Sequence, residues 1–109
     1  SMEQAFDTLE NSMSSLLDFW NAYYLGSKTE VNLDTVQKDV EQAKESLEKL
    51  TPDSNIKTAY DVALAIATKM QTAVKEAAKV QANSATSPVE AMTEFIELID
   101  GYAQALKGL

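Results

Sequence analysis

The side chains that could carry chemistry in this chain are serines and carboxylates, because its 109 residues include no histidine and no cysteine. Three serines lie close together at Ser12, Ser14 and Ser15. A serine nucleophile needs a neighbouring general base, and the usual base is histidine. Lysine is the only basic residue type present, and Ser14 and Ser15 fall on the polar side of their helix. We therefore predict no catalytic residue and no enzymatic activity.

Carboxylates recur at Glu90, Glu94 and Glu97, a spacing that places them on one side of a helix. Di-iron helical bundles bind metal through inward carboxylates and Glu-x-x-His pairs. Here histidine is missing and the apolar stripes carry no carboxylate, so we interpret these glutamates as a solvated face. The sequence contains no calcium loop and no glycine-rich phosphate loop. The prediction is no metal site and no cofactor.

Charge restricts the classes of partner. The net charge is −8, with 17 acidic residues against nine basic ones. Binding to nucleic acid or to an anionic membrane needs a cationic surface, so neither is expected. No apolar run reaches about 18 residues, which predicts no direct membrane insertion. We also expect no signal peptide within these residues, while compartment and oligomeric state stay open.

Apolar residues recur at alternating spacings of three and four over four segments, which predicts helices at about 2–26, 30–50, 53–82 and 87–107. Thr29 or Asn32 would cap the second helix. The first two stripes comprise Met2, Phe6, Leu9, Met13, Leu16, Trp20 and Tyr23, and then Leu33, Val36, Val40, Ala43, Leu47 and Leu50. Short connections favour an all-α, antiparallel up-down-up-down four-helix bundle, with residues 1–109 as a single domain.

The fourth segment opens with Ser87-Pro88-Val89-Glu90, which has the form of a capping box with proline at the first helical position. On this helix we expect the buried face to lie around Ile99, opposite the three glutamates. That face would comprise Val89, Met92, Phe95, Ile96, Ile99, Tyr102, Ala103 and Leu106.

An aromatic cluster spans residues 19–25 at the end of the first helix. The helical wheel turns Phe19 about 100° from Trp20 and puts Leu25 on the polar side. These side chains either cover one end of the bundle or form a contact patch for a partner. The candidate partner contacts are therefore Phe19, Tyr24 and Leu25.

With chemistry excluded, the leading hypothesis is a non-enzymatic helical bundle that serves as a protein–protein interaction module, with another protein as its partner. The alternative is an extracytoplasmic ligand-sensing bundle, or a bundle that binds a small apolar ligand. In the predicted topology both termini lie at one end, which would suit attachment to two membrane helices.

Overall fold

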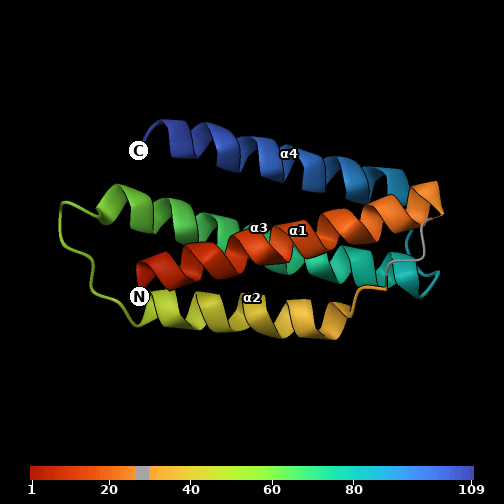
Figure 1. Cartoon of the computed structure of the whole chain (residues 1–109), viewed down its shortest axis with the longest axis horizontal. Coiled ribbons are helices and arrows are strands. Elements are labelled where there is room, and N and C mark those ends of the chain that lie inside the picture. Colours follow the sequence, from red (N-terminus) through yellow and green to blue (C-terminus); the bar gives the residue numbers. More distant parts are fainter. Residues whose placement is uncertain (27–29) are drawn as a thin grey trace.

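A computed structural model describes residues 1–26 and 30–109 and contains four α-helices and no strand within those ranges. The helices are α1 (Met2–Leu25), α2 (Leu33–Glu48), α3 (Lys57–Gln81) and α4 (Pro88–Lys107). They pack into a body measuring 45 × 24 × 23 Å, and the two termini lie at the same end of its long axis (Figure 1). The prediction of an all-helical fold with four helices is confirmed.

Polar side chains at three helix starts accept backbone N–H groups that have no partner within the helix. Ser1 accepts from Gln4, Asn32 accepts from Thr35, and Ser87 accepts from the N–H of Glu90 at 3.2 Å. The serine half of the predicted capping box is thus present, with Pro88 in the first turn. Asn32 is the cap of α2, and the alternative Thr29 lies outside the described residues.

Helix α3 begins at Lys57, four residues later than predicted. The carboxylate of Asp53 accepts the N–H groups of Asn55 and Ile56, at 2.9 and 3.3 Å. This local bonding gives the backbone an alternative to the helix and holds the segment after Pro52 as a turn.

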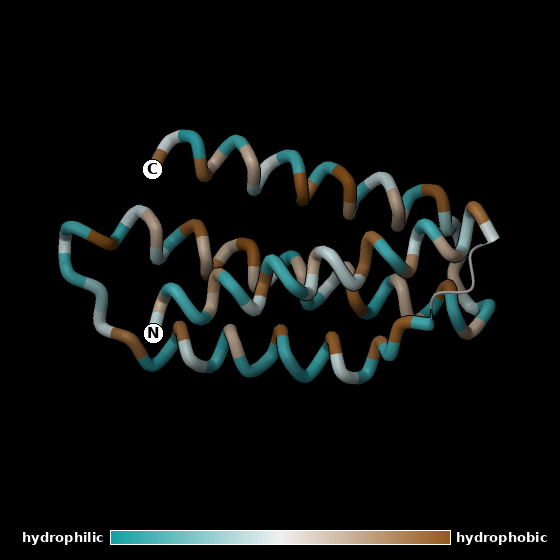
Figure 2. The backbone as a smooth tube through the Cα atoms, in the orientation of Figure 1, coloured by the Kyte–Doolittle hydropathy of each residue, from teal (hydrophilic) through white to brown (hydrophobic). Residues whose placement is uncertain are grey.

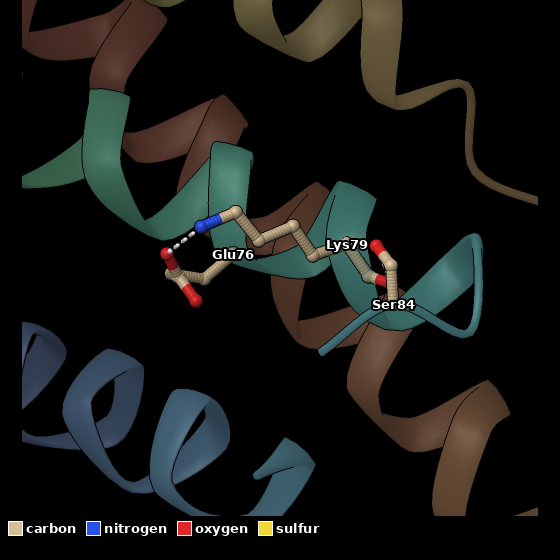
Figure 3. Close-up of polar contacts among 3 residues, drawn as sticks. All are labelled: Glu76, Lys79 and Ser84. Atoms are coloured by element: carbon tan, nitrogen blue, oxygen red, sulfur yellow. Dashed lines mark hydrogen bonds and ion pairs between the residues drawn. The ribbon is translucent and has the colours of Figure 1, made fainter. Parts of the chain in front are cut away.

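Helix α3 ends in a Schellman motif. Asn83 has a positive φ of 57°, and its N–H donates to the carbonyl of Val80. The N–H of Ser84 donates to the carbonyl of Lys79 at 2.8 Å. The two bonds satisfy carbonyl groups that the last turn leaves without a helical partner. The Ser84 hydroxyl reaches the same carbonyl at 3.3 Å, and the Lys79 ammonium pairs with Glu76 (Figure 3).

The predicted stripe of α2 is confirmed, because Leu33, Val36, Val40, Ala43 and Leu47 are all buried. Leu50 follows the end of the helix and is half-buried against the core. In Figure 2 the apolar residues of α2 face the other helices and the hydrophilic ones lie along its outer edge. Helix α3 buries Ala63, Ile66, Ala67, Met70, Val74, Ala77 and Val80.

Helix α1 buries more of its surface than the sequence predicts. Ala5, Ser12 and Phe19 are buried beside the expected Leu9, Met13, Leu16 and Trp20. The reason is that α1 approaches both α2 and α3 closely, so two of its sides face other helices. The hydroxyl of buried Ser12 donates to the carbonyl of Thr8 at 2.8 Å, which satisfies its polar atom. Tyr23, predicted in the stripe, is exposed in the last turn.

The prediction for the buried face of α4 is only partly correct: Phe95 and Tyr102 are buried as expected, and none of the other six predicted residues is fully buried. The helix buries Ala91, Phe95, Leu98 and Tyr102, whereas Val89, Ile96, Ala103 and Leu106 are exposed and Met92 and Ile99 are half-buried. Both sets have the three–four spacing of a packing stripe, so periodicity cannot decide between them. Helix α4 lies closely against α3, and its backbone approaches α1 less closely in the described part of the chain. Only one stripe is therefore covered.

Candidate interaction surface

The three predicted contact residues do not share one environment. Phe19 is only 7% exposed, so the expectation that it reaches solvent is wrong. Its ring packs edge-on against Trp20, with ring centroids 5.0 Å apart, and it borders Val31 and Val80 from neighbouring segments. Phe19 is buried because the side of α1 that carries it also faces α2 and α3. Tyr24 and Leu25 are exposed, and Leu25 is 79% exposed.

The exposed apolar residues of α4 form a second candidate, here called the α4 outer stripe. It comprises Val89, Met92, Ile96, Ile99, Ala103 and Leu106. Val89 is 59% exposed and Ile96 is 50% exposed, while Met92 and Ile99 are half-buried and lean on the core. The stripe extends over nearly the whole helix, which sets it apart from isolated apolar residues at the surface.

Contacts of Tyr102 show how α1 lies beside this helix. Its hydroxyl donates to Glu10 Oε1 at 2.7 Å, and its ring lies 6.2 Å from that of Phe6. Figure 1 places the start of α1 and the end of α4 at the same end of the molecule. The two helices therefore run in opposite directions. Leu17 comes seven residues after Glu10, so its level on α4 is about seven residues before Tyr102. We therefore expect Leu17 to lie at about the level of Phe95 and Ile96 along the long axis.

The exposed side of α1 continues the apolar surface. Glu10, Leu17 and Tyr24 are two helical turns apart, so they share the side of α1 that contacts Tyr102. Leu17 is 43% exposed, Tyr24 is exposed, and Phe6 is half-buried. Tyr24 also stacks on buried Trp20, with centroids 6.0 Å apart, which anchors this exposed ring to the core.

The other side of α4 borders α3. Glu94, Glu97 and Gly101 line surface hollows together with residues of α3 such as Thr72 and Lys69. On the helical wheel of α4, the buried stripe separates Glu94, Glu97 and Gly101 from the α4 outer stripe. The outer stripe is therefore on the side of α4 that is nearer to α1. We define the α1/α4 apolar face as Phe6, Leu17 and Tyr24 together with the α4 outer stripe.

The two helices that form the face are both acidic. Helix α1 carries four acidic residues and no lysine, and α4 carries four acidic residues with Lys107 as its one base. Exposed Glu3, Glu10 and Asp100 border the apolar face. Burial raises the pKa of Tyr102, and the hydrogen bond and charge of Glu10 raise it further. The phenol therefore stays neutral and donates to the carboxylate.

Sequence reasoning missed Leu17 and the exposure of the α4 outer stripe. The signal that could have found them is the presence of two three–four stripes on one helix, since Ala91, Phe95, Leu98 and Tyr102 repeat with the same spacing. A helix that packs against one neighbour can bury only one such stripe.

The described residues also bear on metal sites, membrane-spanning helices and surface hollows. No group of three or more acidic side chains is arranged to hold a metal ion within residues 1–26 and 30–109. None of the helices described has the length and apolar character to cross a membrane. A hollow of about 350 Å³ lies between α3 and α4, with Ala91, Phe95 and Leu98 among its lining residues.

No protein family, curated protein or solved structure matches this chain.

Proposed function

We propose that this protein is a non-enzymatic interaction module that binds another protein through the α1/α4 apolar face. The observation that carries the proposal is the α4 outer stripe, a row of six apolar side chains, four exposed and two half-buried, along a helix that already buries a different row. Contiguous apolar surface of this kind marks contact sites, because covering it releases about 25 cal/mol per Å².

The proposal includes the antiparallel up-down-up-down arrangement of the helices. It is supported by the two termini lying at one end of the molecule and by the link from Tyr102 near the end of α4 to Glu10 early in α1. This arrangement places α1 and α4 on the two sides of the apolar face, and in the view of Figure 1 the two helices draw together away from the end that holds the termini. Two rigid helices hold their side chains in place without a loss of loop entropy on binding.

The test compares two isoleucines that are both exposed and lie on different parts of the surface. Ile96 is in the face, and Ile56, at 38% exposure, precedes α3. The wild-type protein is used to capture partners from an extract of cells that express the gene, and each candidate partner is then purified. We expect Ile96→Gln and Leu17→Gln to weaken the purified partner's affinity by about tenfold or more, as measured by calorimetry.

Ile56→Gln should leave the affinity unchanged, and all three variants should melt near the wild-type temperature. Binding that survives both face substitutions would overturn the proposed site. The absence of any purified protein that binds the wild type would overturn the proposed function.

A second candidate function, the binding of a small apolar ligand, is favoured by the hollow between α3 and α4. Its volume of about 350 Å³ falls in the range of ligand sites, and Phe95 and Leu98 contribute apolar lining. Substituting Ala73, which also lines the hollow, with leucine would fill part of it. If the hollow binds a ligand, a fluorescent apolar probe should bind the wild type and should not bind Ala73→Leu. The same substitution should leave the binding of a protein partner unchanged.

A further inference from the structure

We propose that the occupant of the α1/α4 apolar face is an amphipathic helix of the partner protein, with lysine or arginine beside its apolar stripe. The inference rests on the proposed function and adds the class of partner.

Spacing points to a helix. The steps from Val89 to Met92, Ile96, Ile99, Ala103 and Leu106 are three, four, three, four and three residues. This alternation is the seam by which one helix packs its side chains between those of another. The stripe runs for about 25 Å along the axis of α4, which matches a helix of about five turns.

A second row of contacts comes from α1. Leu17 and Tyr24 lie two turns apart on the side of α1 that faces α4, and both are exposed. A helix lying along α4 would thus contact apolar side chains of both helices. Its own buried stripe would need to be as wide as that of a core helix, with apolar residues at about three of every seven positions.

Charge selects among helices. Exposed Glu3, Glu10 and Asp100 border the face, and Lys107 is the one lysine that the sequences of α1 and α4 contain. A second copy of this chain would bring the same acidic residues to the interface, and like charges at an interface disfavour association. A basic flank on the partner would pair with these carboxylates and speed its approach. An anionic lipid surface is repelled by the same charges.

The test uses the whole protein and synthetic peptides of about 18 residues. Two peptides share one apolar stripe, with leucine at about three of every seven positions, and differ in their flanking residues, which are lysine in one and glutamate in the other. A third has the composition of the lysine peptide in scrambled order. Fluorescence anisotropy measures binding at about 50 mM and 300 mM salt.

We expect the lysine-flanked peptide to bind about tenfold or more tightly than either control peptide, and to weaken as salt rises. Ile96→Gln and Leu17→Gln should reduce its affinity by about tenfold, and Ile56→Gln should not change it. The double variant Glu3→Gln/Asp100→Asn should reduce the preference for lysine over glutamate flanks. Glu10 is retained in that variant because it bonds Tyr102.

Several results would overturn the inference. If the scrambled peptide binds as tightly as the lysine-flanked peptide, the attraction is due to charge alone. If the glutamate-flanked peptide binds as tightly, the partner helix does not need a basic flank. Light scattering that shows a dimer of the wild type and a monomer of Ile96→Gln would make a second copy the occupant. If Ile96→Gln weakens a native partner but no helical peptide binds, the proposed function stands and the helical occupant fails.

Discussion

The hydroxyl of Tyr102 donates a hydrogen bond of 2.7 Å to Glu10, and this bond joins α1 and α4 through two residues that are 92 positions apart in the sequence. Tyr102 is buried, and the ring of Phe6 lies beside it. The backbones of α1 and α4 approach each other less closely than those of the other neighbouring helices described. The long side chains of Tyr102, Phe6 and Glu10 therefore bridge α1 and α4 at this end of the molecule.

Removing the hydroxyl tests this bridge. Tyr102→Phe keeps the buried ring and loses the donor, so we expect the free energy of unfolding to fall by about 1 kcal/mol. Glu10→Gln keeps a neutral acceptor and should cost less. Chemical denaturation of the two single variants and the double variant gives the coupling energy. Strictly additive effects would show that the two side chains do not interact in solution.

The same residue predicts how stability depends on alkaline pH. The pKa of Tyr102 is raised in the folded protein above its ordinary value of 10.0. The unfolded chain therefore loses this proton first, and the contribution of Tyr102 to stability is complete below about pH 10 and declines above it. We expect the melting temperature of the wild type to fall more steeply than that of Tyr102→Phe between about pH 9.5 and 11. If the melting temperatures of the two proteins fall equally with pH, the pKa of Tyr102 is not raised in the folded protein.

Phe19 and Leu25 should respond oppositely to truncation. Phe19 is buried against Trp20, so Phe19→Ala leaves a cavity and should cost about 3 kcal/mol or more of stability. Leu25 is exposed in the last turn of α1, and Leu25→Ala should change stability by less than about 0.5 kcal/mol. Thermal melts followed by circular dichroism measure both. A small loss for Phe19→Ala would restore it as a contact residue.

Phe95 and Ile96 test the rotation of α4 with two adjacent positions. Phe95 is fully buried, and Phe95→Ala should cost about 3–5 kcal/mol. Ile96 is half exposed, and Ile96→Ala should cost less than about 1 kcal/mol. The reverse order of the two losses would mean that α4 packs through its outer stripe and not through the stripe that contains Phe95. Urea denaturation of both variants gives the comparison.

Asn83 tests the end of α3. Its positive φ is a conformation that glycine adopts without a side-chain clash, so Asn83→Gly should match or exceed the wild-type stability. Asn83→Val should lose about 1–2 kcal/mol, because a branched side chain is strained in the left-handed region. Ser84→Ala is the control, since it keeps the N–H bond to Lys79 and should change little. Equal melting temperatures for the glycine and valine variants would argue against this backbone conformation.

The sequence by itself determined the helical class, the number of helices and most of their ends. Local features suffice for these, because periodicity and caps act over a few residues. The stripe of α2 from Leu33 to Leu47 was predictable because a single stripe on an otherwise polar helix leaves one choice of buried face. The start of α3 was less predictable, because the side chain of Asp53 accepts N–H groups that a longer helix would use.

The tertiary structure decided which apolar residues are covered. Phe19 is buried because α1 contacts α2 and α3 together, and Ile96 is exposed because α4 packs on α3 through Phe95. In both helices the sequence offers more apolar positions than one contact can cover. The choice among them depends on how closely each pair of helices approaches, which reflects the shapes of residues far apart in the chain. That choice created the α1/α4 apolar face, and no single helix contains the information that selects it.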